Sequence, residues 1–158
     1  MKRLLALTSV LALSVAVQSA AAHDYTAGDL QIMHPVAFES PKLAKTGAGF
    51  LMITNTGDTD DVLLDVRADF PKVQIHTTEE TDGVARMIHV DALPIPAGET
   101  VKLAPGGFHV MFMGLGDPFK DGEEIPATLI FENAGEVEIT FDVEPRPESG
   151  EGMDHSSH

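Results

Sequence analysis

The segment VEITFDV, residues 137–143, decides the fold class of this chain. Apolar residues stand at positions 137, 139, 141 and 143, and Glu138, Thr140 and Asp142 stand between them. A period of two residues is that of a β-strand with one face on a core and the other face in water. The segment therefore predicts a half-buried strand in an all-β domain.

Similar short apolar or alternating runs recur through the chain and are separated by Gly, Pro, Asn and Asp. No run has the period of a helix. Strands at such spacing, with turn signals between them, predict an antiparallel β-sandwich or barrel. We expect the other strands at residues 30–34, 49–54, 62–66, 73–78, 84–90, 100–103, 109–113 and 127–131.

The beginning of the chain has the pattern of a secretory signal peptide, with two basic residues, a short apolar run and a small-residue cleavage site ending at Ala22. We expect three parts: a signal peptide at 1–22, one β-sandwich domain at 23–144, and a flexible tail at 145–158, where little can be buried. No second long apolar segment follows, so we expect a periplasmic protein with no membrane insertion.

The charge of the chain is strongly acidic. Without the two basic residues of the expected signal peptide, 8 basic and 25 acidic residues remain, a formal charge of −17. Such a surface repels nucleic acid and attracts cations and basic protein patches. The chain contains no cysteine, which excludes a blue-copper electron-transfer site because that site needs a thiolate ligand.

Four residues from separate segments suggest a metal site: His76, Met87, His109 and Met111. Histidine offers a neutral imidazole nitrogen and methionine a neutral thioether sulfur, and this donor set suits Cu(I) best. His109 and Met111 lie two apart on an expected strand, so their side chains leave the same face.

The dipeptide Asp82-Gly83 is a good two-residue hairpin turn between the strands that hold His76 and Met87. With that turn, Thr78 faces Met87 and residue 76 faces residue 89. His76 and Met87 then become diagonal neighbours on one face, about 7 Å apart between their Cα atoms.

The residues alone leave alternatives open. In this register His89 competes as a ligand, and Met113, one step beyond Met111 on the same face, is a rival of that residue. If the signal peptide is removed after Ala22, the amino group and imidazole of His23 could chelate copper together. We interpret Met33 and His34 as structural.

The stretch from residue 73 to residue 131 resembles the periplasmic copper chaperones of the PCu(A)C family, whose motif is His-x10-Met-x21-His-x-Met. Every spacing of that motif is met, and the segments ETDGV (80–84), IPAG (95–98) and LAPGGFHVMFMGL (103–115) are also similar. A weaker resemblance extends over residues 30–143. It implies a cupredoxin-like β-sandwich in which four residues bind Cu(I): His76, Met87, His109 and Met111.

The resemblance also implies a function in which copper is handed to cytochrome c oxidase during its assembly. The expected partners are the CuA site of oxidase subunit II or a thioredoxin-like copper protein. Copper buffering or resistance is the alternative function. Four protein ligands would close the metal site, so we expect no enzyme. A metal-free adhesion module would not need the motif.

The C-terminal tail adds three further donors, Met153, His155 and His158, beside Glu151 and Asp154. Nitrogen and carboxylate ligands favour Cu(II) over Cu(I). We therefore expect a second, weaker copper site in the tail, with a solvated tail as the alternative.

Overall fold

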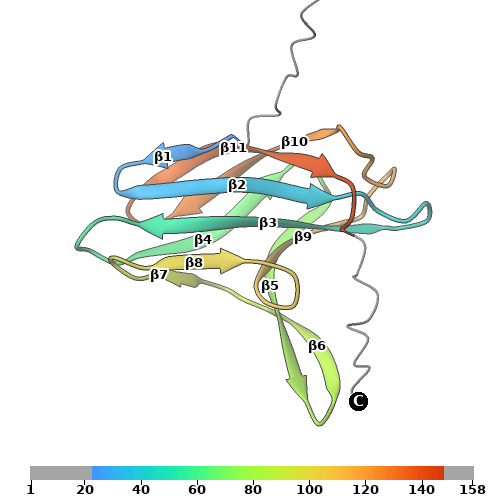
Figure 1. The fold of residues 1–158 in the computed structure, drawn as a ribbon, viewed down its shortest axis with the longest axis horizontal. Helices are drawn as coiled ribbons and strands as arrows, with labels where there is room; N and C mark the ends of the chain where they lie inside the picture. The colour runs from blue at the N-terminus through green and yellow to red at the C-terminus, as the bar shows by residue number, and fades with distance from the viewer. Residues whose placement is uncertain (1–22, 148–158) are drawn as a thin grey trace, which may run out of the picture.

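The computed structural model describes residues 23–147, and this part of the chain consists of strands and connecting turns without a helix (Figure 1). No helical segment long and apolar enough to cross a bilayer is found in it. The strands are β1 (Tyr25–Ala27), β2 (Leu30–Phe38), β3 (Thr46–Asn55), β4 (Asp61–Ala68), β5 (Lys72–Thr81), β6 (Val84–His89), β7 (Leu93–Ile95), β8 (Thr100–Leu103), β9 (His109–Met113), β10 (Glu124–Phe131) and β11 (Gly135–Glu144).

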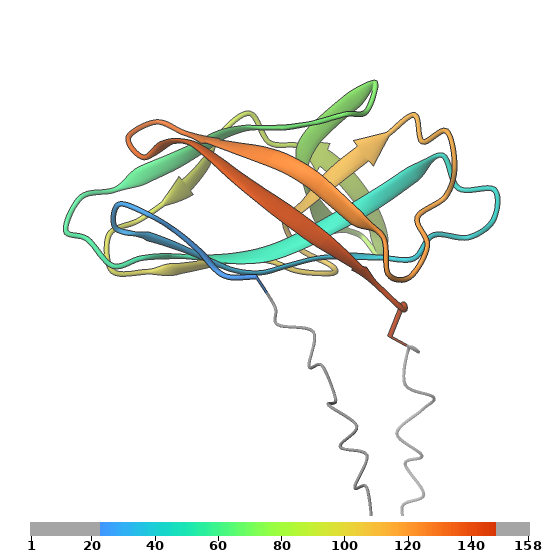
Figure 2. The same ribbon diagram turned by 90° about the horizontal axis from the view of Figure 1, so that it is seen from above.

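The strands form one hydrogen-bonded path that folds over on itself. Its order is β6-β5-β9-β3-β2-β11-β10-β4-β7, while β1 pairs with β2 and β8 pairs with β3. Seen from above, β10 and β11 run obliquely across β3 (Figure 2). The all-β, cupredoxin-like sandwich expected from the sequence is confirmed.

One strand pair departs from the expected antiparallel arrangement. β11 runs parallel to β2 and pairs with it only through Asp142, Val143 and Glu144. The other named ladders are antiparallel. Because β2 and β11 lie far apart in the sequence, no hairpin fixes their relative direction.

The inner face of β11 lies in the core, as the alternation in residues 137–143 predicted. Phe141 is fully buried, and its ring meets that of Phe112 edge to face at a centroid distance of 5.6 Å. Gly49 makes room for both rings, because a Cβ atom there would lie 2.9 Å from Phe141 and 3.0 Å from Phe112. This close approach explains a glycine inside a strand.

The nine expected strands are all present, but two short ones were not predicted. β1 has only three residues, which are too few for a periodic pattern to be recognised. β7 contains Pro94, a residue that argues against a strand, and residues 93–95 are not among the strands expected from the sequence. The prediction was wrong because β7 lies at an end of the hydrogen-bonded path, where a proline without an N–H group is tolerated.

A buried carboxylate fixes the turn that leads into β11. Asp61 accepts hydrogen bonds from the backbone N–H groups of Val62 (2.8 Å), Asn133 (2.9 Å) and Ala134 (2.9 Å). It is one of the few buried polar side chains. Its bonds tie the start of β4 to the turn between β10 and β11, and a buried carboxylate bound in this way stabilises the folded state.

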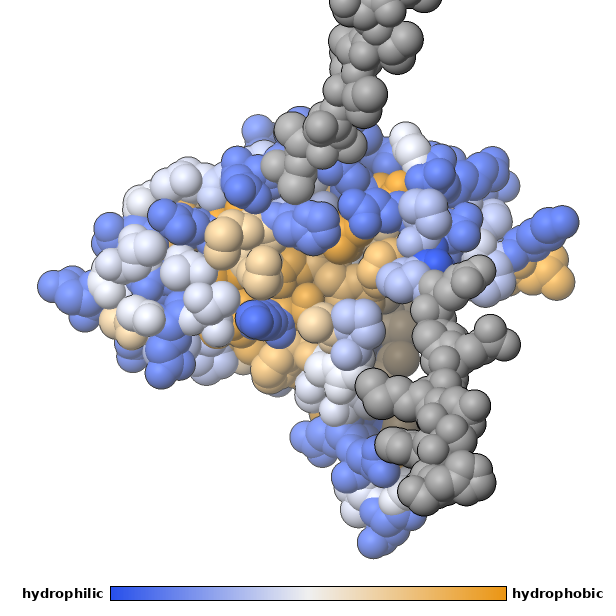
Figure 3. All heavy atoms as spheres, viewed as in Figure 1, coloured by the Kyte–Doolittle hydropathy of each residue, from blue (hydrophilic) through white to orange (hydrophobic). Residues whose placement is uncertain are grey.

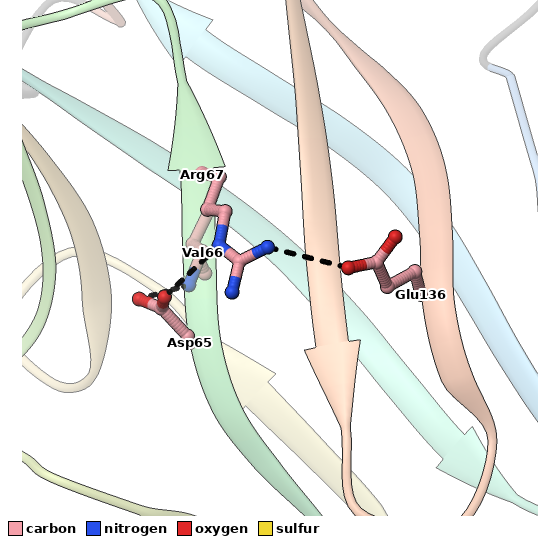
Figure 4. Close-up of polar contacts among 4 residues, drawn as sticks. All are labelled: Asp65, Val66, Arg67 and Glu136. Atoms are coloured by element: carbon pink, nitrogen blue, oxygen red, sulfur yellow. Dashed lines mark hydrogen bonds and ion pairs between the residues drawn. The ribbon is translucent and has the colours of Figure 1, made fainter.

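A second polar link joins β4 to β11 at the surface. The guanidinium of Arg67 lies 3.5 Å from Asp65 Oδ2 and 3.2 Å from Glu136 Oε1, and the Val66 N–H group donates to Asp65 Oδ1 (Figure 4). All three charged side chains are at least half exposed. Solvent therefore screens the ion pairs, and their contribution to stability is small.

We expect Phe141→Ala to lower the free energy of unfolding by about 3–5 kcal/mol, because it leaves a cavity in the core. Glu138→Ala, on the outer face of the same strand, should change it by less than about 0.5 kcal/mol. Urea unfolding followed by circular dichroism measures both. Equal effects would contradict the assignment of the two faces of β11.

Candidate metal centre

The β5–β6 hairpin has the register that the sequence predicted. Asp82 (φ 54°) and Gly83 (φ 74°) form the turn, and two consecutive positive φ angles are what a two-residue type I′ turn requires. Thr78 stands opposite Met87, and His76 stands opposite His89. His76 and Met87 are therefore diagonal neighbours on one face of the hairpin.

Strand β9 continues this face on the other side of β5. His109 pairs with His76, and Met111 pairs with Gln74. Paired residues of adjacent strands share a face, so a row of three histidines crosses β6, β5 and β9. The ring of His76 lies 5.8 Å from that of His89 and 6.0 Å from that of His109 between centroids.

The two methionines lie on the same face as this row, at positions diagonal to His76. Met111 is half-buried on β9, whereas Met87 on β6 is 60% exposed. The structure thus brings His76 and His109 together as direct neighbours. Met87 lies on one side of this pair along the strands and Met111 on the other.

Two ring nitrogens in this row are buried without a hydrogen-bond partner: His76 Nδ1 and His109 Nε2. The other nitrogen of each ring donates to an oxygen, from His109 Nδ1 to the carbonyl of Gly107 (3.0 Å) and from His76 Nε2 to Gln74 Oε1 (3.3 Å). These bonds select the tautomers whose lone pairs are on the two unpartnered nitrogens. Metal-binding histidines are commonly held by such bonds.

His89, the competitor considered from the sequence, differs from the other two histidines. Its Nδ1 lies 3.2 Å from the carbonyl oxygen of Ile75, and its Nε2 lies 3.1 Å from Asp91 Oδ1. Both ring nitrogens therefore already face an oxygen acceptor. Met113 stands opposite Lys72, at the far end of the β5–β9 ladder from His76 and His109, whereas Met111 is the next residue on their face. The geometry thus favours Met111 over Met113 as a ligand.

Burial lowers the pKa of His76 below its ordinary value of 6.5, and the positive charges that His109, His89 and Lys72 can carry lower this pKa further. His76 is therefore neutral at pH 7. Neutral imidazole is the form that binds metals.

The surroundings of the row differ on its two sides. On one side the β5–β6 hairpin projects from the body of the sandwich, and its tip is hydrophilic (Figures 1 and 3). On the other side Met111 pairs with Ala48 of β3, and the same face carries half-buried Phe50 and Met52. Figure 3 shows an apolar area over β2, β3 and β8. Only one side of the row therefore offers an apolar environment.

The other candidate ligands lie elsewhere. His34 is exposed at an irregularity of β2 with a φ angle of 50°, and Met33 pairs with Met52. The tail residues Met153, His155 and His158 lie outside the described residues. Sequence reasoning missed Gln74, although it lies two residues before His76 on the same strand face and could have been found from that spacing.

Solved structures that are similar to this chain include copper-binding domains. The PCuAC domain of PmoF2, solved with copper bound, superposes with a TM-score of 0.66 and 31% identity, covering 78% of this chain and 99% of that domain. The copper(I) form of DR1885 from Deinococcus radiodurans has a TM-score of 0.59 and 27% identity, covering 83% of this chain and 87% of DR1885.

The family model described as lipoprotein LpqE-like matches residues 30–143. The lipoprotein-named Lxx21020 of Leifsonia xyli subsp. xyli is 33% identical over 98 residues, which are 61% of this chain. The match spans 59% of that relative's length. Together these matches show that the chain belongs to the PCu(A)C family and fits its LpqE-like model.

In the metal-free protein we expect the His76 ring to titrate below pH 6.5, which NMR of the imidazole resonances can measure. Between its lowered pKa and 6.5 the unfolded chain binds a proton that the folded chain does not. The pH-dependent contribution of His76 to stability is therefore fully present above pH 6.5 and is lost as the pH falls through that window. His76→Gln should make the pH dependence of stability shallower, and titration of His76 above 6.5 would contradict the burial argument.

Proposed function

We propose that this protein carries Cu(I) on His76, Met87, His109 and Met111. The observation that supports this most is the pair of unpartnered ring nitrogens in adjacent, tautomer-fixed histidines. A buried polar atom without a partner costs free energy, and a metal ion would remove that cost. Two imidazoles and two thioethers are soft, neutral donors that favour Cu(I).

The relatives support copper as the cargo. The PmoF2 domain is described as copper-bound, and DR1885 was solved in its Cu(I) form. This chain aligns with 99% of the former and 87% of the latter. We infer the same cargo here. The lipoprotein names of the LpqE-like family and of Lxx21020 support an exported protein, and we propose the periplasm as its location.

The site has properties that suit a carrier. Its ligands bear no charge, so a thiolate acceptor can bind Cu(I) more strongly and remove it by ligand exchange. Met87 is mostly exposed on the projecting hairpin and could leave the metal first while the buried His109 holds it. We propose delivery to the CuA site of cytochrome c oxidase subunit II, directly or through a thioredoxin-like copper protein.

An anaerobic Cu(I) titration against a chromophoric chelator tests the binding step. We expect residues 23–158 to bind one equivalent of Cu(I) tightly. Met111→Leu should weaken this binding by at least about tenfold, since the loss of a residue that only hydrogen-bonds to a metal ligand already has an effect of that size. Met113→Leu and His34→Ala are the matched controls and should bind as the wild type does. Equal binding by Met111→Leu and Met113→Leu would contradict the ligand assignment.

The same loaded protein tests delivery. Mixed with an apo, reduced CuA domain, it should lose its copper to that domain, as followed by gel filtration and metal analysis. If the chain retains its copper under these conditions, delivery to this acceptor is wrong, and buffering becomes the better account of the same site.

A further inference from the structure

A second group of side chains that could bind a metal lies away from β5, β6 and β9, on β10, on β11 and before β1. Glu124 and Asp142 stand directly opposite each other in the β10–β11 ladder. Their neighbours Ile125 and Phe141 point into the core, so both carboxylates lie on the outer face. Like charges directly opposite each other destabilise a strand pair. A bound cation would remove this repulsion.

His23 is the third member of the group. One ring nitrogen of His23, one carboxylate oxygen of Glu124 and one of Asp142 all lie within 4.8 Å of one another. Ligand atoms that each lie about 2.0–2.2 Å from one ion can be up to about 4.4 Å apart. His23 and Glu124 are exposed and Asp142 is half-buried, so small rotations of the side chains can close the remaining gap.

The position of His23 is set by the two residues that follow it. Asp24 Oδ1 accepts a hydrogen bond from the backbone N–H group of His34 (3.2 Å). The hydroxyl of Tyr25 accepts one from the N–H group of Thr140 on β11 (2.9 Å). These bonds and the pairing of β1 with β2 hold the segment beside β11 (Figure 1). Hydrogen bonds therefore hold the backbone next to His23 in place, as the β10–β11 ladder holds Glu124 and Asp142.

The donors define the class of metal. One imidazole nitrogen and two carboxylate oxygens suit a divalent ion and do not suit Cu(I). Among the first-row divalent ions Cu(II) binds most strongly to such ligands. Removal of the expected signal peptide after Ala22 would place a free α-amino group on His23. This group and the ring would then chelate one ion together, giving two nitrogen and two oxygen donors, which suit tetragonal Cu(II).

We propose that His23, Glu124 and Asp142 form a second metal site, selective for Cu(II), which the α-amino group of His23 completes in the exported chain. It uses β10, β11 and the segment before β1, whereas the His/Met cluster uses β5, β6 and β9. One domain thus carries a soft donor set for Cu(I) and a hard one for Cu(II). The second site does not depend on the proposed function of the first.

The test uses residues 23–158 with His23 as the first residue. One equivalent of redox-inert Ag(I) first fills the soft His/Met cluster, and Cu(II) is then titrated and followed by EPR. We expect one Cu(II) with a tetragonal nitrogen and oxygen signal. Glu124→Gln/Asp142→Asn and His23→Ala should each weaken its binding by at least about tenfold.

A double variant with the same change in charge is the control. Glu132→Gln/Glu138→Gln alters two exposed carboxylates outside the group and should leave the Cu(II) affinity and EPR signal unchanged. Melting curves without metal check folding, since loss of the like-charge pair should not lower the Tm of Glu124→Gln/Asp142→Asn. Cu(II) should raise the Tm of the wild type more than that of this variant.

The proposal is overturned if Glu124→Gln/Asp142→Asn binds Cu(II) with the affinity and EPR signal of the wild type, because the ion would then lie elsewhere, for example on His155 and His158. A chain that begins at Ala22 tests the α-amino group separately. Its affinity should fall without being lost, and an unchanged signal would remove the amino group from the ligand set. Failure of Cu(I) binding at His76 and His109 would affect none of these results.

Discussion

The candidate metal centre depends on the register of one strand pair, β5 with β9. This register places His76 opposite His109 on the outer face and Ile75 opposite Val110 on the inner face. Both apolar residues are buried in the core. A slip by one residue would turn the histidines into the core and the apolar pair into water, so core packing holds the register. Packing on one face of the sheet thereby fixes the metal-binding geometry on the other.

Without a metal, the candidate site lowers the stability of the folded protein. Two buried nitrogens without partners cost about 1–3 kcal/mol each. Burial also lowers the pKa of His76, so its ring stays neutral near pH 7 and gains no partner by protonation. A soft cation that accepts both lone pairs removes it. The hydrogen bonds to Gly107 and Gln74 hold the rings in the tautomers that a metal needs, so neither imidazole has to change its tautomer on binding.

The features that could be predicted from the sequence are those that depend on residues close together in the chain. The alternation around Phe141 identified a strand and its buried face, and the Asp82-Gly83 turn predicted the hairpin register because short hairpins leave few choices. The proximity of His23 to Glu124 could not be predicted, since it depends on strands far apart in the chain. The sequence also could not predict which ring nitrogen of His109 lacks a hydrogen-bond partner. That nitrogen is Nε2, because Nδ1 donates to the carbonyl of Gly107.

X-ray absorption at the copper K-edge tests the central claim most directly, that a soft His/Met set binds Cu(I) on the shared face of β5, β6 and β9. The protein, loaded anaerobically with one Cu(I), should show two nitrogen and two sulfur scatterers around the metal, and Met87→Leu should remove one sulfur. A shell of nitrogen and oxygen alone, or a sulfur count unchanged in Met87→Leu, would contradict the account.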